Sequence, residues 1–237
     1  MKYDVIDDTS RGMTGEYGQL NVYDSNLSKY VLALPLETLP AVSGSVNTVE
    51  NNVTTSRVIG KIKGKRTIDD KDVNFLWNRD NIERLNQLIG KQNDYLISYK
   101  DGTGWKFSGE ITYRNDDGSA SDKLTGTLTI VASDVDEVAT SNVLDLMAKT
   151  CVITNKNLPA NITLAKTNGS IEIPVQMSNA NATITTSSTN SAITATYSAG
   201  KVTISTTSGE ATNGIVALKP VAEGEASWVN YILVEVE

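Results

Sequence analysis

Residues 93–132 read NDYLISYKDGTGWKFSGEITYRNDDGSASDKLTGTLTIVA, and this stretch decides the fold. Within it, apolar and polar residues alternate in three runs, as they do in strands that bury one face. The runs are residues 93–100, 105–114 and 123–132. Asp101-Gly-Thr-Gly104 is typical of a tight hairpin turn, and residues 115–122 predict a longer polar loop. The stretch therefore predicts a β-meander of three antiparallel strands.

One segment before the meander has helical periodicity instead. From about Asp69 to Lys91, apolar residues recur at spacings of three and four, with Phe75 alone off the stripe. The stripe comprises Val73, Leu76, Trp77, Ile82, Leu85, Leu88 and Ile89. Aspartates crowd the start of the segment, and Gly90 stands where a helix C-cap glycine belongs. The pattern predicts one amphipathic helix over about residues 69–91.

Two further segments, residues 18–36 and 54–66, are predicted to contain strands. Between them, Pro40–Asn52 is polar and has no helical period, so a loop is predicted there. Together with the meander and the helix, these elements predict a mainly β fold for residues 1–150. We expect an antiparallel β-sandwich or barrel with one flanking α-helix.

Composition changes near residue 150, which predicts a domain boundary there. Residues 1–150 contain 17 basic and 22 acidic side chains, whereas residues 151–237 contain 4 and 6. Ser and Thr make up about a quarter of the second part, which has seven short strand-like runs. The runs are residues 162–164, 170–175, 182–186, 193–197, 201–205, 214–219 and 228–236. We predict an immunoglobulin-like β-sandwich over residues 151–237, with residues 133–142 leading up to the boundary.

Composition also excludes several classes of function. Histidine is absent, so a Ser–His–Asp triad and every histidine zinc site are excluded. The single cysteine, Cys151, cannot form an internal disulfide or a cysteine metal cluster, and we expect it to be a buried small apolar residue. The net charge of −7 does not favour a general affinity for nucleic acid. We therefore expect no enzyme, no cofactor and no metal site.

The termini and apolar runs bear on localisation. The N-terminus, MKYDVIDDTS, lacks the basic start and apolar run of a signal peptide. The longest apolar stretch near it, residues 30–36, is far shorter than the roughly 20 residues of a membrane span. We expect synthesis in the cytoplasm and no membrane span.

One concentrated basic segment stands out in this acidic chain. It contains Arg57, Lys61, Lys63, Lys65 and Arg66, and strand geometry would put the three lysines on one face. A nucleic-acid site would need interleaved aromatic residues to stack bases, and none is present. We interpret the segment as a solvated or subunit-facing strand, with nucleic-acid binding as the alternative.

The three tryptophans allow two interpretations. Trp77, Trp105 and Trp228 would serve as stacking platforms in a carbohydrate-binding module, or they would belong to the core. Trp77 falls on the apolar face of the predicted helix, and Trp105 begins an alternating strand. These positions favour the core for both.

Residues 54–136 resemble the major tail tube proteins of long-tailed bacteriophages. The resemblance is carried by the order of a basic strand, a helix and the meander, and above all by two motifs. These motifs are Ser108-Gly-Glu-Ile-Thr-Tyr113 and the Thr-rich strand Leu124-Thr-Gly-Thr-Leu-Thr-Ile130 after a short acidic loop. A C-terminal Ig-like domain is also common in that family, which agrees with the break near residue 150.

The resemblance implies a structural protein of the virion tail, made in the host cytoplasm. Such proteins assemble as hexameric rings that stack into a tube, contact other tail proteins and let DNA pass without sticking during ejection. The Ig-like domain would be displayed outside, where it could touch host surface glycans. The predicted loop at residues 40–52 would take part in stacking, and the basic segment would lie at a subunit contact.

The resemblance further implies an acidic lumen. The strands and loops of the meander offer six acidic candidates for it: Asp94, Asp101, Glu110, Asp116, Asp117 and Asp122. Two other functions stay open from the residues alone. One is a secreted or surface carbohydrate-binding or adhesin module, and the other is an enzyme such as a glycosidase that uses only carboxylates.

Overall fold

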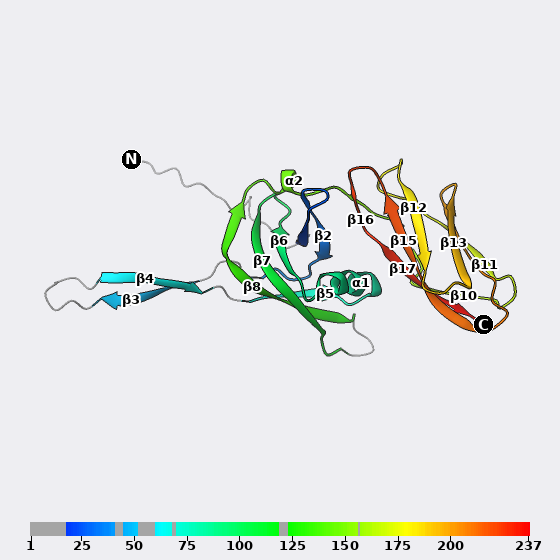
Figure 1. The fold of residues 1–237 in the computed structure, drawn as a ribbon, viewed down its shortest axis with the longest axis horizontal. Coiled ribbons are helices and arrows are strands. Elements are labelled where there is room, and N and C mark those ends of the chain that lie inside the picture. Colours follow the sequence, from blue (N-terminus) through cyan, green and yellow to red (C-terminus); the bar gives the residue numbers. More distant parts are fainter. Residues whose placement is uncertain (1–17, 41–44, 52–59, 68–69, 119–122, 156) are drawn as a thin grey trace, which may run out of the picture. The chain divides into compact units, whose positions relative to one another are not determined.

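Strands make up most of the computed structural model, and two short helices accompany them (Figure 1). The structure describes residues 18–237 except residues 41–44, 52–59, 68–69, 119–122 and 156. The mainly β class predicted from the sequence is confirmed. The chain divides into two compact units. The first contains residues up to Tyr23, Ala33–Trp77 and Leu85–Leu146, and the second contains Asp24–Leu32, Asn78–Arg84 and Met147–Glu237.

A six-stranded sheet with the order β2-β1-β6-β7-β8-β5 contains most of the strands of the first unit, while residues 29–32 of β2 count with the second. Its strands are β1 (Gln19–Asp24), β2 (Lys29–Pro35), β5 (Lys71–Leu76), β6 (Gln92–Ser98), β7 (Gly104–Asn115) and β8 (Thr125–Thr140). The β6–β7 and β7–β8 ladders are antiparallel, so the predicted meander is confirmed. The sheet is open, with β2 and β5 as its outer strands, and the barrel alternative is therefore wrong for the described strands.

Alternation along these strands selects the face that forms the core. Tyr95 stands opposite Phe107 in the β6–β7 ladder, and Ile111 stands opposite Ile130 in the β7–β8 ladder. All four side chains are at most 3% exposed. Burial of one such side chain stabilises the fold by about 1.5–3 kcal/mol, so the period of two determines which face turns inward.

The predicted helix over residues 69–91 is wrong in its first part. Residues Lys71–Leu76 form β5, which pairs with β8. Val73 and Phe75 are fully buried in this strand, whereas Asp72 is exposed. The period of two prevails here because pairing with β8 supplies both a hydrogen-bonded ladder and a core to fill.

The helix that remains, α1 (Arg79–Leu88), is ten residues long. Asn78 caps its start, because the Oδ1 atom of Asn78 accepts the backbone N–H of Asn81 at 2.9 Å. Gly90 follows its end with a φ of +70°, as expected of a C-cap glycine. The cap at the N-terminus is thus an asparagine and not one of the aspartates near residue 70.

Three aromatic rings cluster next to the start of α1. The Phe75 and Trp77 rings are stacked with centroids 6.0 Å apart, and the Tyr113 ring meets Trp77 edge-on at 5.8 Å. A Cβ atom added to Gly126 would lie 2.7 Å from Phe75 Cζ, so this cluster requires a glycine beneath it. Trp77 therefore belongs to this cluster. The sequence pattern placed it on a helix, and that prediction is wrong.

Strand β8 is longer than predicted. Residues 133–142 were expected to lead up to a domain boundary, but β8 continues to Thr140 and pairs again with β7, where Trp105 stands opposite Ala139. The polar composition of this stretch resembles a linker, yet the start of β7 needs a partner for its backbone groups. Helix α2 (Val143–Leu146) follows and buries Val143.

A separate two-stranded sheet precedes β5. It consists of β3 (Ser45–Asn51) and β4 (Gly60–Thr67), which are antiparallel with Glu50 opposite Lys61. The predicted strand within residues 54–66 is confirmed from Gly60 onward. The predicted loop at residues 40–52 is wrong for Ser45–Asn51, because these residues pair with β4 instead of remaining irregular.

Two sheets share one hydrophobic core in the second unit. The four-stranded sheet has the order β10-β17-β15-β12, and the three-stranded sheet has the order β11-β14-β13. The strands are β10 (Asn161–Leu164), β11 (Ser170–Pro174), β12 (Thr183–Ser188), β13 (Ile193–Ser198), β14 (Lys201–Thr206), β15 (Thr212–Val221) and β17 (Asn230–Val236). Each of the seven predicted runs has its strand. A short parallel pair, β9 (Thr150–Cys151) with β16 (Ala226–Ser227), adjoins them.

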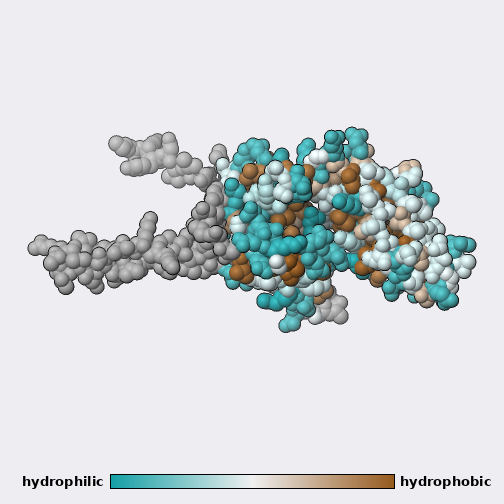
Figure 2. All heavy atoms as spheres, viewed as in Figure 1, coloured by the Kyte–Doolittle hydropathy of each residue, from teal (hydrophilic) through white to brown (hydrophobic). Residues whose placement is uncertain are grey.

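Short polar side chains cover the outside of these sheets. Thr194 and Thr196 of β13 are exposed, whereas Ile193 is 1% exposed. The pale colours over this unit in Figure 2 reflect the near-neutral hydropathy of Ser and Thr. Cys151 is buried and free, as predicted.

The first turn of α1 belongs to the second unit and makes specific polar contacts within it. The Asp80 carboxylate accepts the backbone N–H of Tyr231 at 2.8 Å and the side-chain Nδ2–H of Asn230 at 2.7 Å. The Arg84 guanidinium lies 4.7 Å from the centroid of the Trp228 ring. The Trp228 ring is therefore already in contact with a cation of the same chain.

Candidate functional site

The face of the six-stranded sheet opposite the core is polar and forms the candidate site. Residues that stand opposite one another in a ladder lie on the same face, so the register identifies its members. Asp72 stands opposite Thr129, and Thr129 stands opposite Thr112. We call this surface the polar face. Its polar members are Asp72, Asn74, Gln92, Asp94, Lys106, Ser108, Glu110, Thr112, Arg114, Thr127 and Thr129. The same register also places the exposed Leu76 and Val131 and the buried Leu96 on this side of the sheet.

Hydroxyl groups hold the carboxylates of the polar face in place. Each of three aspartates accepts a hydrogen bond from a Ser or Thr hydroxyl on a neighbouring strand. The pairs are Thr129 with Asp72 at 2.6 Å, Ser108 with Asp94, and Thr127 with Asp116 at 2.6 Å. A hydrogen bond of this kind contributes about 0.5–1.5 kcal/mol net, less where water competes. The result is a set of oriented, hydrated carboxylates.

The charge of the polar face is weakly acidic. Its acidic residues are Asp72, Asp94 and Glu110, all exposed, and Asp116 joins them from the loop after β7. Its basic residues are Arg114, which is exposed, and Lys106, which is half-buried. A polyanion therefore meets more negative than positive charge here.

The structure brings together three of the six predicted lumen residues. Asp94 and Glu110 lie on the polar face, and Asp116 is bonded to it through Thr127. Asp117 is exposed in the loop that follows β7. Asp122 lies outside the described residues.

Asp101 has a different role from the other candidates. It lies in the β6–β7 turn, where its Oδ1 atom accepts the backbone N–H of Thr103 at 2.8 Å and the Thr103 hydroxyl at 2.7 Å. These two hydrogen bonds lower the pKa of Asp101. The carboxylate therefore stabilises a turn. Asp72 was missed as a candidate because the sequence pattern assigned it to a helix; its alternation with Val73 was the available signal.

The predicted basic contact residues lie on β4 or before it. Lys61, Lys63, Lys65 and Arg66 belong to β4, whose side chains are outside the described part of the structure, and so is Arg57. Their shared face and their role at a subunit contact stay predictions.

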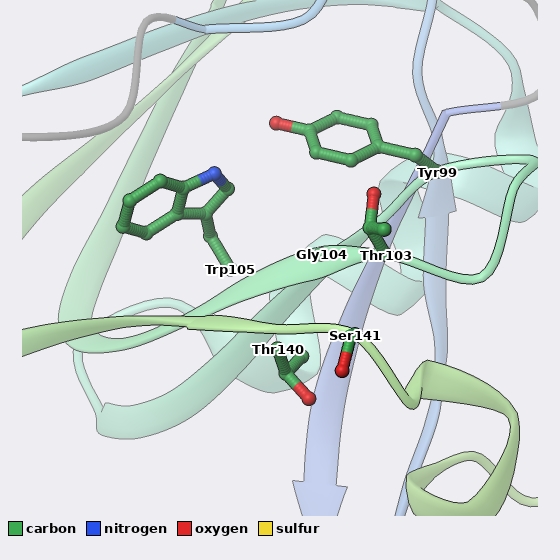
Figure 3. Close-up of a pocket in the computed structure, with 6 residues that line it drawn as sticks. All are labelled: Tyr99, Thr103, Gly104, Trp105, Thr140 and Ser141. Atoms are coloured by element: carbon green, nitrogen blue, oxygen red, sulfur yellow. The ribbon is translucent and has the colours of Figure 1, made fainter. Parts of the chain in front are cut away.

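A pocket of about 390 Å³ lies at the other end of the meander, near the β6–β7 turn (Figure 3). Trp105 lines this pocket and is half-buried, so it lies on the core face of the sheet but is not enclosed there as the core prediction implied. Trp105 is the second residue of β7, opposite Ile97 of β6 and Ala139 of β8, so it lies where the sheet meets the β6–β7 turn.

Neither a metal centre nor a membrane-spanning helix emerges from the described residues. No three His, Cys, Asp or Glu side chains among them are arranged to hold a metal ion. No helix in that part of the chain is long and apolar enough to cross a bilayer. The chemistry that the polar face itself offers is hydrogen bonding and charge, and neighbouring hydroxyls already bond to the carboxylates of Asp72, Asp94 and Asp116.

Comparison with known proteins gives limited likeness. No protein-family model matches the sequence, and no curated protein matches it. A chain of the six-fold symmetrised baseplate of the anti-feeding prophage has a TM-score of 0.41 and 9% identity, covering 54% of this chain and 95% of its own. A chain from the tail of an empty GTA particle has a TM-score of 0.41 and 15% identity, covering 52% of this chain and 96% of its own. Neither likeness places the chain in a family.

Proposed function

We propose that this chain is a structural subunit of a bacteriophage tail tube, assembled as stacked hexameric rings around a channel for DNA. One observation carries the proposal. The two motifs that resemble tail tube proteins, Ser108–Tyr113 and Leu124–Ile130, lie side by side on β7 and β8, with Tyr113 opposite Leu128. Motifs separated by a loop in the sequence thus form one continuous surface of the sheet.

The β3–β4 sheet also supports assembly. Among the described elements these two strands pair only with each other. An isolated two-stranded hairpin is marginally stable in water, so such an element gains stability when it packs on a partner. We propose that β3 and β4 contact a neighbouring subunit, with Lys61, Lys63, Lys65 and Arg66 facing acidic residues of that neighbour.

The polar face would line the channel. Duplex DNA carries one negative charge per roughly 1.7 Å of its axis, so a cationic wall would hold it through many phosphate contacts. An acidic, hydroxyl-rich wall repels phosphates over about 8 Å at physiological salt. The oriented carboxylates of Asp72, Asp94 and Asp116, together with the exposed carboxylate of Glu110, suit such a wall.

Residues 151–237 would form an Ig-like domain on the outside of the tube. The proposal makes the protein a virion component that contacts itself and other tail proteins, with this domain facing host surface glycans. Exposed hydroxyls such as those of Thr194 and Thr196 suit a hydrated outer surface.

Assembly state tests this function against its alternative. The purified chain would be studied by size-exclusion chromatography and negative-stain electron microscopy. We expect rings or tubes with six-fold symmetry. A persistent monomer that binds glycans would contradict the proposal and favour the secreted or surface carbohydrate-binding module. A folded monomer that neither assembles nor binds glycans would contradict both.

A further inference from the structure

The pocket near the β6–β7 turn has a use that the proposed tube does not require. Its volume of about 390 Å³ falls within the range of small-molecule sites, about 300–1000 Å³. Its lining comes entirely from the first unit. The lining residues are Tyr99, Thr103, Gly104, Trp105, Thr140 and Ser141.

The turn beside the pocket is firmly built. The backbone N–H of Tyr99 donates to the Thr103 carbonyl at 2.9 Å, and the N–H of Gly102 donates to the Tyr99 carbonyl at 3.1 Å. The Gly102 carbonyl in turn accepts the N–H of Val143 at 2.9 Å, which ties the turn to α2. The residues of this turn would therefore lose little conformational entropy when a ligand binds.

Gly104 permits the close approach of strands beneath the pocket. A Cβ atom at this position would lie 2.3 Å from the Ile97 carbonyl oxygen and 2.8 Å from Val143 Cγ2. Only a glycine allows the strands and α2 to meet at this distance. The floor of the pocket is thus fixed by backbone.

Two aromatic side chains give the pocket its chemistry. Figure 3 shows the Tyr99 and Trp105 rings on the same side of the strands, with the Tyr99 hydroxyl directed toward the Trp105 side. The hydroxyls of Thr140 and Ser141 point away from these rings, so those two residues contribute mainly backbone. Both rings are half-buried and keep accessible surface.

The polar edges of these rings are available to a ligand. In the described part of the structure, neither the Tyr99 hydroxyl nor the Trp105 indole N–H has a hydrogen-bond partner. Burial, and secondarily the nearby charge of Asp101, raises the pKa of Tyr99, which keeps its phenol protonated as a donor. The Thr103 hydroxyl donates its hydrogen bond to Asp101, so its oxygen can accept a hydrogen bond from a ligand.

The lining excludes most other ligand classes. Among the described residues, the lining contains no cation to hold a phosphate or carboxylate and no carboxylate to hold a cation. It offers no free strand edge to an extended peptide, because β7 lies between β6 and β8. What fits is a neutral, hydroxylated ring, whose C–H face packs on an aromatic ring while its hydroxyls bond to polar edges.

We propose that this pocket binds one neutral pyranose unit of a polysaccharide, with Trp105 as the stacking platform and Tyr99 and Thr103 as its hydrogen-bonding partners. The site is distinct from the polar face and from residues 151–237. A tail subunit with such a site would hold a neutral glycan through its first unit. The inference is independent of ring assembly.

Ligand-observed saturation-transfer NMR tests the site in the full-length chain. The probes are maltotriose, cellotriose and triacetylchitotriose, each titrated to millimolar concentration. We expect saturable binding of at least one. Trp105→Ala should weaken that binding at least tenfold, Trp105→Phe should restore most of it, and Tyr99→Phe should weaken it severalfold by removing only a hydroxyl.

A matched control separates the pocket from general loss of an aromatic group. Tyr23, which is 42% exposed on β1, lies outside the lining, so Tyr23→Ala should bind as the unchanged chain does. If Trp105→Ala fails to fold, Tyr99→Phe decides the matter. Absence of saturable binding to all three probes, or equal binding by the pocket variants and the unchanged chain, would overturn the proposal.

Discussion

The carboxylate of Asp80 accepts the backbone N–H of Tyr231 at 2.8 Å, although the two residues are 151 positions apart. Burial raises the pKa of Asp80, and the hydrogen bonds from Tyr231 and Asn230 oppose that rise only in part. The Oδ1 atom of Asn230 is buried and has no hydrogen-bond partner among the residues that the structure describes. A protonated Asp80, or an asparagine in its place, can donate to this oxygen after the Asn230 amide turns over.

The first prediction concerns pH and Asp80. A carboxyl whose pKa is raised by folding stabilises the fold below its unfolded value, 3.8, and this stabilisation is lost as pH rises through the folded value. Asp80→Asn removes that dependence. We expect its free energy of unfolding to equal or exceed that of the unchanged chain at pH 7, with the difference shrinking toward pH 4. Urea denaturation at several pH values measures it, and a difference that stays constant would contradict the assignment.

The second prediction concerns the glycine beneath the aromatic cluster. A Cβ atom in Gly126→Ala would contact both Phe75 and Trp77 at less than 3 Å. We expect the substitution to lower the free energy of unfolding by about 1–3 kcal/mol, as overpacking does. Gly118→Ala is the matched control, because its nearest neighbour would be Leu124 Cδ1 at 3.7 Å. Equal stability of both variants in urea would contradict this prediction, because it would show that the aromatic rings move aside at no cost in free energy.

Much of this fold can be predicted from the sequence, because several elements have a clear local period. The meander over residues 93–132 and the seven strands after residue 160 follow alternation and turn residues directly. The segment Lys71–Leu76 does not, because six residues can match a period of two and a period of 3.6 at once. Only the presence of β8 as a partner decides between them.

The candidate site was harder to predict than the strands. Asp94 and Glu110 could be named from the sequence, but their common face depends on the register between β6 and β7. Asp72 was missed with the strand that carries it. Alternation places Trp105 on the same face as Phe107, but it does not reveal that a pocket opens beside the first residues of β7.

The third prediction concerns the basic strand. Replacing Lys61, Lys63 and Lys65 with glutamate should impair ring assembly at low salt, measured by analytical ultracentrifugation. An exposed ion pair contributes only about 0–1 kcal/mol, so the effect should come from its repetition around a ring and should weaken as salt screens it. The control reverses three exposed lysines elsewhere. These are Lys149, Lys166 and Lys219. Normal rings from the β4 variant would refute the proposed contact.

The fourth prediction concerns residues 151–237. A chain that stops after Thr150 should still assemble, since the first unit contains its own sheet and core. It should also be less stable than the full chain, because Asp80 loses Tyr231 and Arg84 loses Trp228. Electron microscopy and thermal unfolding measure the two effects. A truncated chain that folds but forms no rings would count against a dispensable outer domain.

The most direct test of the tail tube proposal is a cryo-electron microscopy map of the assembled protein. We predict hexameric rings whose inner surface carries more acidic than basic side chains, with the polar face of Asp94 and Glu110 turned toward the channel. A channel lined mainly by lysine and arginine, or a protein that forms no ring under any assembly condition, would contradict it.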